Sequence, residues 1–392
     1  MIEFAVTFSP GAELEVEFSE NVALDVDMGQ VMEVLATEER TVELSMLSGN
    51  QVILPTSGKG MRKVTIQKPD TLLPENIKKD VVIGGVTGAL LAPPTGPYIE
   101  YTSLDSLGRV FTAKFRGTVV PEHAFADLAE LISVDMPDNV IAIGDSGFYR
   151  CQKLTLTSLP SEITSIGDFA FADCSKLALT SLPSGITSLG DYAFRDCPSL
   201  ALTTLPSGIT SIGQYAFRNC TKLALTTLPP GITSIGEFAF LNCYPLSLTS
   251  LPSGLTSIGQ YAFNNCQRLA LTSLPSGLTS LPTAAFQYCP KLALTTFPSG
   301  MTSIGDYVFR NCYQLSSITL PPALTSIGDF AFANCTGLET VRFTSTVSSI
   351  PNRVFSGCTK LSTIYVPWSQ GQVANAPWGA NNATIIYDYT EN

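Results

Sequence analysis

The chain has 392 residues, a net charge of −11, 45% hydrophobic residues and 14% charged residues. So apolar a sequence can bury enough surface to fold, which excludes an intrinsically disordered protein. The acidic balance excludes the basic footprint of a nucleic-acid-binding protein, and a single histidine, His123, excludes chemistry that needs several imidazoles.

Residues 1–92 form the first predicted region. Alternating apolar and polar residues in Glu13–Phe18 and Thr41–Met46 predict strands, so we expect a small, mostly β-structured attachment region. The acidic start lacks the basic and apolar segments of a secretory signal. No run approaches the ~18 apolar residues of a membrane helix, so no membrane insertion is expected.

Residues 93–118 are predicted to be a linker followed by a capping hairpin. The composition changes near Pro93-Pro94, and residues 97–120 contain two alternating runs around Asp105-Ser106-Leu107-Gly108. A stack of repeats needs such a terminal cap.

A repeat of 23 residues follows. Its anchors are ten equally spaced cysteines: Cys151, Cys174, Cys197, Cys220, Cys243, Cys266, Cys289, Cys312, Cys335 and Cys358. Leu128 stands one interval earlier and marks a degenerate first repeat, which makes about eleven. A fixed period in this range indicates a solenoid or another repeat array.

Each repeat is predicted to contain one short helical turn and one strand. Phe stands three residues before the cysteine and Leu three after it, which is helical spacing. The Leu-Ala-Leu-Thr-Ser-Leu segment alternates like a strand, and Pro-Ser-Gly predicts a turn. Stacked parallel strands would make residues 119–367 a solenoid roughly 50 Å long. Residues 368–392, with Trp368 and Trp378, are expected to cap it through a strand at Ala383–Tyr389.

The position five residues after the cysteine leaves two interpretations open. Seven middle repeats have Leu there, whereas the last three have Ser or Thr there and an apolar residue at the next position. Either the strand register shifts within the array and these leucines point inward, or the seven leucines form an exposed ladder on the concave face. We favour the inward arrangement, because a long exposed apolar ladder invites association.

The ten cysteines are expected to be buried free thiols. Disulfides or a metal site are the alternatives, but zinc needs four ligands at one point. The column places only one thiol in each layer, so each cysteine is expected to act as a small hydrophobic core residue. No metal, no cofactor and no catalytic residues are expected. The Gly144-Asp145-Ser146-Gly147 match to a protease signature is attributed to chance, and His123 is expected at the surface.

An aromatic column occurs five residues before the cysteine. It contains Phe169, Tyr192, Tyr215, Phe238, Tyr261, Tyr307 and Phe330. Stacking between neighbouring repeats is one interpretation, and a ligand-binding stripe is the other. An acidic column precedes it at Asp145, Asp168, Asp191, Asp306 and Asp329, and is explained by helix capping, with calcium binding as the alternative.

Ligand contacts are expected at positions that vary between repeats, because core positions must repeat. These positions are the two residues before and the two after each cysteine, where aromatic and Arg side chains suit binding. With the tyrosines of the aromatic column, the candidate ligand-binding residues are Arg195, Arg218, Tyr288, Arg310, Tyr313, Tyr192, Tyr215, Tyr261 and Tyr307.

The repeats resemble the BspA-type leucine-rich repeat. The residues that follow its pattern most literally are Leu315, Ile318, Leu320, Pro321, Ile327, Gly328, Ala331, Phe332 and Cys335. The resemblance covers about residues 119–367. It implies a curved right-handed solenoid with a parallel sheet on its concave side. It also implies a surface adhesion or recognition protein rather than an enzyme.

A second resemblance concerns the ends of the chain. Residues 73–88 and 56–61 are similar to motifs in tail and fibre proteins of phages and prophages of Gram-positive gut bacteria, and residues 373–380 resemble their C-terminal tails. This similarity implies attachment to other tail proteins through residues 1–92, and possible trimerisation.

The leading functional hypothesis is therefore a phage or prophage tail-associated virion protein, assembled in the bacterial cytoplasm. Its solenoid would bind a host cell-surface protein or glycan. Reduced cysteines fit that compartment. The alternatives are a bacterial surface adhesin, located at the cell surface, and a purely structural decoration protein.

Overall fold

The computed structural model describes residues 98–104, 109–345 and 347–390, together with eight short strands between residues 5 and 87. These strands confirm a small, mostly β N-terminal region. They are β1 (Ala5–Ser9), β2 (Glu13–Glu17), β3 (Ala23–Asp27), β4 (Val31–Leu35), β5 (Thr41–Leu44), β6 (Lys63–Gln67), β7 (Val82–Ile83) and β8 (Val86–Thr87). The sheet order is β1-β2-β6-β5, with separate pairs β3-β4 and β7-β8. The predicted strands at residues 13–18 and 41–46 correspond to β2 and β5.

A hairpin begins the well-described part of the chain. β9 (Tyr98–Leu104) pairs antiparallel with β10 (Val110–Arg116), as the two alternating runs predict. β10 also pairs in parallel with β12 (Ser133–Asp135) of the first repeat. The hairpin therefore forms a three-stranded sheet with β12, and its buried residues Val110, Ala113 and Phe115 cover the first layer of the core.

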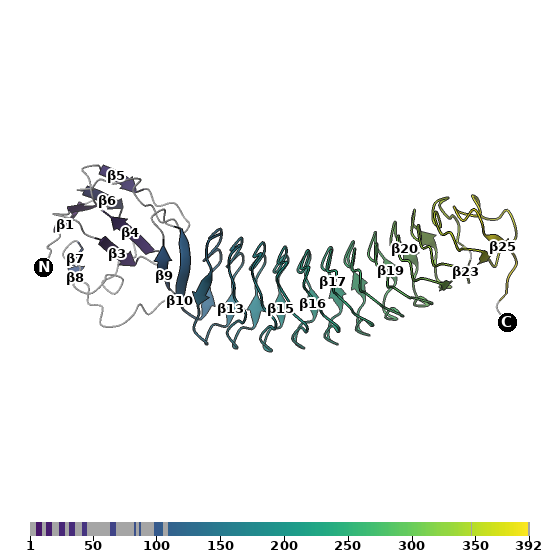
Figure 1. Ribbon diagram of the computed structural model, residues 1–392, viewed down its shortest axis with the longest axis horizontal. Coiled ribbons are helices and arrows are strands. Elements are labelled where there is room, and N and C mark those ends of the chain that lie inside the picture. Colours follow the sequence, from purple (N-terminus) through teal and green to yellow (C-terminus); the bar gives the residue numbers. More distant parts are fainter. Residues whose placement is uncertain are drawn as a thin grey trace.

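The solenoid has about twelve turns that stack side by side along the long axis of the molecule (Figure 1). One side of ten of the described turns is a two-residue strand, in which Ser, Ala or Val points outward and Ile, Leu or Val inward. These strands are β11 (Val119–Val120), β13 (Ala142–Ile143), β14 (Ser165–Ile166), β15 (Ser188–Leu189), β16 (Ser211–Ile212), β17 (Ser234–Ile235), β18 (Ser257–Ile258), β19 (Ser280–Leu281), β20 (Ser303–Ile304) and β22 (Ser326–Ile327). They pair in parallel, each with the equivalent residues of its neighbour, in three successive sheets.

The strand predicted after each cysteine exists only towards the two ends of the array. At the C-terminal end it forms β21 (Ser317–Leu320), β23 (Thr340–Phe343), β24 (Thr363–Tyr365) and β25 (Thr384–Ile386). In the middle repeats the inward residues are spaced differently, as with Leu202 and Leu205. Two inward residues three apart cannot both satisfy the alternation of a strand, so the chain bends at Thr203.

The inward arrangement of the Leu column is confirmed. Six of its members are fully buried: Leu179, Leu202, Leu225, Leu248, Leu271 and Leu294. Leu156, in the first full repeat, is partly buried against the same core. The register therefore shifts within the array, because Ile318, one position later in its repeat, is equally buried.

The predicted helical turn across each Phe and Cys is not present. Residues five and one before the cysteine, such as Phe169 and Asp173, have φ angles of 55° and 62°. These left-handed values interrupt a right-handed helix. The backbone N–H of Phe171 donates to Ala193 of the next turn at 2.8 Å, whereas that of Ala172 donates back to Phe169 at 3.0 Å. Every second hydrogen bond thus joins two layers, which a helix could not do.

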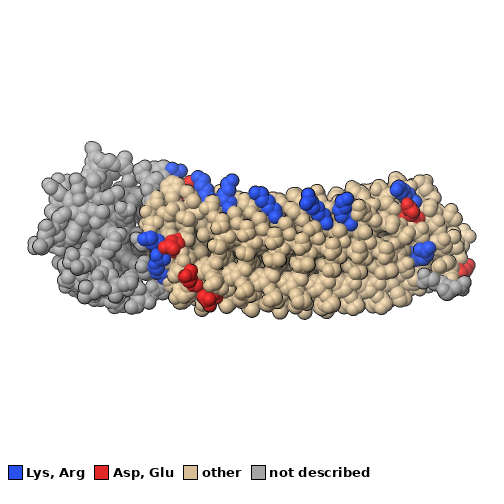
Figure 2. Space-filling model, turned by 60° about the horizontal axis from the view of Figure 1, so that its bottom comes forward, with Lys and Arg blue, Asp and Glu red and all other residues tan. Residues whose placement is uncertain are grey.

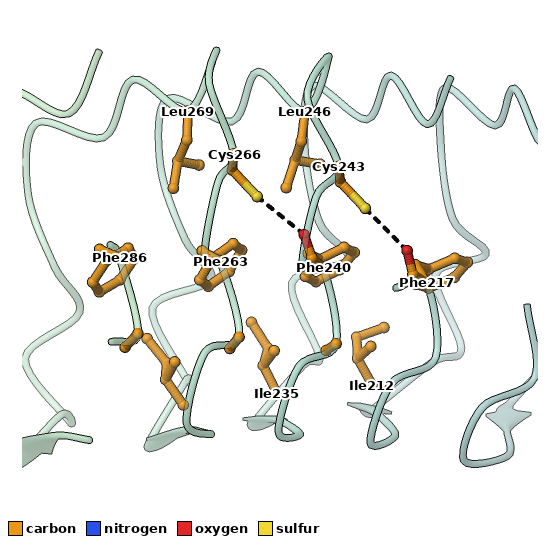
Figure 3. Packing of buried hydrophobic residues seen from close by; sticks show 14 of the residues in the cluster. Ile212, Phe217, Ile235, Phe240, Cys243, Leu246, Phe263, Cys266, Leu269 and Phe286 are labelled. Atoms are coloured by element: carbon orange, nitrogen blue, oxygen red, sulfur yellow. Dashed lines mark hydrogen bonds between the residues drawn. The ribbon is translucent and has the colours of Figure 1, made fainter. Parts of the chain in front are cut away.

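The core is a set of parallel columns, one residue per layer. The Phe column stacks face to face, with neighbouring ring centroids from 4.8 Å (Phe125–Phe148) to 5.9 Å (Phe286–Phe309) apart. Figure 3 shows the Cys and Leu columns on one side of the Phe rings and Ile212 and Ile235 on the other. No single repeat could bury such a column, so the layers stabilise one another.

The C-terminal residues complete a last turn. β25 pairs in parallel with β24, and Trp378 is fully buried in line with the Phe column. The backbone N–H of Phe355 donates to the Trp378 carbonyl at 3.0 Å, and the Trp378 indole N–H donates to Ala374 at 2.8 Å. Trp368 packs edge-on against Phe343 at 5.2 Å. The two tryptophans therefore cover the end of the core.

Candidate functional site

All nine candidate ligand-binding residues lie on one edge of the solenoid. We call this the repeat edge: the residues from six before to two after each cysteine. Tyr288 and Tyr313 are its most exposed candidates, with 41% and 47% of their surface accessible. The other seven are partly buried. The repeating turn explains this arrangement, because it places equivalent positions of successive repeats next to one another.

The aromatic column forms a stacked ladder of partly exposed rings, as the stacking interpretation predicts. Ring centroids are 4.4 Å apart for Phe169–Tyr192, 4.5 Å for Tyr192–Tyr215 and 4.8 Å for Phe238–Tyr261. Ala284 interrupts the ladder, which resumes with Tyr307. Stacking between layers therefore uses the ring faces and leaves the ring edges towards solvent.

Arg195 and Arg218 are less free than their variable positions suggest. The Arg195 side chain is only 20% exposed, donates to the Asp173 carboxylate at 2.5 Å and lies 5.7 Å above the Tyr192 ring. Arg218 lies 5.8 Å above the Tyr215 ring. The Arg195 guanidinium pairs with Asp173 and Asp196 and so binds two neighbouring layers together.

The acidic column supports the next layer rather than capping a helix. One carboxylate oxygen of Asp145 accepts the backbone N–H of Asp168 at 2.8 Å, and Asp168 accepts that of Asp191 at 2.7 Å. The capping interpretation was wrong because the segment is not helical, although a backbone N–H is still the donor. Within the parts of the chain that the structure describes, no three His, Cys, Asp or Glu side chains gather to hold a metal ion.

A polar ladder runs along the position just before each cysteine. The Asn219 amide donates to Asp196 at 2.5 Å, Asn242 to Asn219 at 2.7 Å and Asn265 to Asn242 at 2.9 Å. Each of these residues has a left-handed φ between 57° and 63°. Asn and Asp tolerate that conformation best among residues with a Cβ. Tyr288 ends this ladder and instead points an aromatic ring to the surface.

The ten cysteines are buried free thiols, each in its own layer. Every thiol donates to the carbonyl of the Phe one layer back, for example Cys243 to Phe217 at 3.0 Å (Figure 3). Burial raises the pKa of the Cys289 thiol to about 12 and holds that of Cys266 well above its usual range. These thiols are structural, because a protonated, buried sulfur is a poor nucleophile.

Gly144–Gly147 and His123 show no joint catalytic arrangement in the described residues. Ser146 has a left-handed φ of 55°, as other repeats have at this position. His123 is largely exposed and lies 3.2 Å from Glu122. An open hollow nearby is lined by β13, β14, β15 and the following Gly-Asp segments, and it contains none of the candidate residues.

The structure reveals a basic column that the sequence analysis missed. It occupies the second position after the cysteine, and Figure 2 shows its blue side chains as a row along the solenoid. Its members are Lys153, Lys176, Lys222, Arg268, Lys291 and Lys360, all exposed. Counting charge by repeat position would have found it, whereas the net charge of −11 hides it.

These stacked 23-residue turns, with one inward Phe and one inward Leu per layer, define a leucine-rich-repeat solenoid. The model of the BspA type leucine rich repeat region matches residues 118–245, 187–301 and 280–375. Because these matches together cover more than half of the chain, the protein belongs to this family. No curated protein sequence matches the chain.

The solved structures that resemble this one include the following two. A leucine-rich repeat protein from Bacteroides ovatus ATCC 8483 is 20% identical, covers 74% of this chain and 98% of its own, and has a TM-score of 0.47. A leucine rich cell surface protein from Faecalibacterium prausnitzii A2-165 is 25% identical, covers 72% of this chain and 96% of its own, and has a TM-score of 0.41. In the described residues, no helix is long and apolar enough to cross a membrane.

Proposed function

We propose that this protein is a recognition module whose repeat edge binds a host cell-surface protein or glycan. The observation that carries the proposal is the gathering of exposed and half-exposed aromatic and Arg side chains on one edge. Tyr288, Tyr313 and Arg310 lie there beside a rigid stacked ladder. Rigid aromatic and Arg side chains lose little entropy on binding and are enriched at binding hot spots. The family resemblance to adhesion proteins supports the same conclusion.

The finer proposal is that the protein belongs to the tail of a phage or prophage, with residues 1–92 as its attachment region. The similarity of residues 56–61, 73–88 and 373–380 to tail and fibre proteins supports it. Ten thiols that need no oxidant are compatible with assembly in the bacterial cytoplasm. A homotrimer is part of this proposal. The alternatives are a bacterial surface adhesin and a structural decoration protein.

Cell binding by the full chain tests the recognition role. A variant with Tyr288→Ala, Arg310→Ala and Tyr313→Ala should bind candidate host cells at least about tenfold more weakly, because hot-spot side chains each contribute over 1 kcal/mol. Ile141→Ser, on the opposite strand side and 47% exposed, is the matched control. Unchanged binding by the folded triple variant would move the site away from the repeat edge.

Fractionation tests the tail assignment. Induced cultures should yield the protein in sedimented phage particles, and antibodies should label the tail. If the protein is instead found only in the cell envelope, the surface adhesin replaces the virion protein. Particles that bind hosts equally well without this protein would indicate the decoration role.

A further inference from the structure

The basic column carries positive charge that its surroundings do not neutralise. Lys153 pairs with Glu130 at 2.6 Å, but the other five members form no ion pair with the described residues. Residues 197–305 contain four basic residues and a single acidic one, Glu237. Asp173 and Asp196, which directly precede cysteines on the repeat edge, both contact Arg195. The central solenoid is therefore locally basic within an acidic chain.

The column is a line parallel to the solenoid axis. Every member holds the same position in its repeat, and neighbouring layers of the core lie about 5 Å apart. Consecutive members are separated by one, two, two, one and three layers, so a cation occurs about every second layer. A ligand that contacts all of them must be long, linear and negatively charged at similar intervals.

A band of free hydroxyl groups runs beside this column. It consists of the residues six and seven after the cysteine: Thr157-Ser158, Thr180-Ser181, Thr203-Thr204, Thr226-Thr227, Thr249-Ser250, Thr272-Ser273 and Thr295-Thr296. All are exposed, and none donates a side-chain hydrogen bond to the described part of the chain. By contrast, Thr256 and Thr302, on the strand side, donate to carbonyls of the preceding layer at 3.2 and 3.1 Å.

Both features face the same way. The leucines three and five after the cysteine, such as Leu223 and Leu225, point into the core. The residues between and around them, Lys222, Ala224 and Thr226, therefore point outward together. Alanine between the cation and the hydroxyls leaves the surface low and open. Tyr244 and Tyr313, one residue before the column position, add exposed rings at its border.

We propose that this strip, from the basic column to the hydroxyl band, binds a linear acidic polysaccharide along the solenoid axis. Carboxylates on the sugars pair with the cations, sugar hydroxyls bond to the Thr and Ser side chains, and sugar rings pack on the tyrosines. A polynucleotide fits less well, because DNA carries a charge about every 1.7 Å, far denser than the column. The inference deepens the proposed recognition function by naming the ligand class and rests on it.

Direct titration of the full chain with purified polymers tests the strip. The probes are two acidic polysaccharides, hyaluronate and polygalacturonate, together with the neutral methyl ester of polygalacturonate and oligo(dT). Hyaluronate carries its acidic groups on alternate sugars. Binding of an acidic polysaccharide that weakens with added salt, with no binding of the methyl ester, is the expected result. Failure of both acidic polysaccharides to bind would overturn the proposal, and tighter binding of oligo(dT) would replace it with a nucleic-acid site.

Variants locate the contact. Lys176→Gln, Lys222→Gln, Arg268→Gln and Lys291→Gln together should weaken binding about tenfold or more, since each exposed charge pair contributes up to about 1 kcal/mol. The matched variant K176R/K222R/R268K/K291R keeps the charge and should keep the affinity. Thr203→Val with Thr226→Val and Thr249→Val should weaken binding without changing its salt dependence.

Three outcomes separate this inference from the proposed function. Unchanged polysaccharide binding by the folded Gln variant overturns the strip. A wild-type chain that binds host cells but neither acidic polysaccharide overturns this inference alone and leaves recognition to Tyr288, Arg310 and Tyr313. If the wild-type chain binds neither cells nor polysaccharides, both proposals fail.

Discussion

The thiol of Cys243 donates a hydrogen bond to the backbone carbonyl of Phe217, one layer back, at 3.0 Å. The same carbonyl also accepts the backbone N–H of Cys220 at 3.1 Å. Each Cys–Phe contact therefore joins two layers and fills the second lone pair of a buried carbonyl. This relationship explains why a small side chain with a weak donor suits every layer.

Thiol reactivity is the first consequence. A thiol-reactive probe should modify almost none of the ten cysteines in the native protein and all ten after denaturation, because all are buried. The measurement is a spectroscopic count of released reporter with and without guanidinium chloride. Fewer than ten thiols in the denatured, unreduced sample would show that some are oxidised.

Stability should fall at alkaline pH. Burial holds the pKa of Cys289 at about 12, whereas an unfolded thiol ionises near 8.5. The raised pKa means that the thiol's contribution is full below about pH 8.5 and is lost as the pH rises toward about 12. Between these limits the slope is about −1.4 kcal/mol per pH unit for each such thiol. Denaturant unfolding of wild type and Cys289→Ala across this range should give a shallower slope for the variant; equal slopes would contradict the assignment.

The polar ladder predicts different effects for two substitutions of Asn242. This residue bonds to Asn219 and Asn265 and has a left-handed φ of 62°. Asn242→Ala should cost about 2–4 kcal/mol, because it removes two hydrogen bonds and forces alanine into a strained conformation. Asn242→Gly also removes the hydrogen bonds, but glycine adopts the left-handed conformation without strain. It should therefore destabilise the protein by about 1–2 kcal/mol less than Asn242→Ala does. If Gly proves as destabilising as Ala in chemical denaturation, the left-handed turn does not matter for stability.

The acidic column should act through an acceptor oxygen, not through its charge. Asp168 accepts the backbone N–H of Asp191 at 2.7 Å. Asp168→Ala should cost about 1–2 kcal/mol, since it leaves that N–H without its partner. Asp168→Asn keeps an acceptor oxygen and should recover much of the loss. Thermal unfolding of the two variants compares them; an equal loss for Asn would assign the effect to charge.

Two arginine positions should separate structure from surface. Arg195→Ala should destabilise the protein by about 1–3 kcal/mol, because it removes the partly buried guanidinium that pairs with Asp173 and Asp196. Arg268→Ala, in the exposed basic column, should change stability by no more than about 0.5 kcal/mol. Circular dichroism during chemical denaturation measures both. A large loss for Arg268 would contradict its assignment to a free surface.

The sequence alone determined the architecture of this protein. Ten cysteines at one interval, each with Phe before and Leu after, leave stacking as the only way to bury their columns. The buried thiols, the inward Leu residues and the stacked aromatic column follow from the same repetition. Residue type and period are sufficient for these features, because every layer packs against a copy of itself.

Only the tertiary structure decided the path of the chain within each layer. The spacing of Phe171 and Cys174 fits a helix as well as it fits the observed turn, since both bring residues three apart to one side. The choice depends on the bond from Phe171 to Ala193 in the next layer, a contact 22 residues away that no local pattern encodes. Asp and Asn before most cysteines were the one local signal of the left-handed turn.

The strand positions, and the placement of the basic column on an exposed surface, also required the stacked structure. Leu202 and Leu205 are both buried only because the chain bends at Thr203, which a period-two pattern does not predict. Lys176, Lys222 and Lys291 are scattered in the sequence and form a line only when the turns are superposed. Stacking converts a 23-residue period into adjacency in space, and so it alone decides which side chains share a surface.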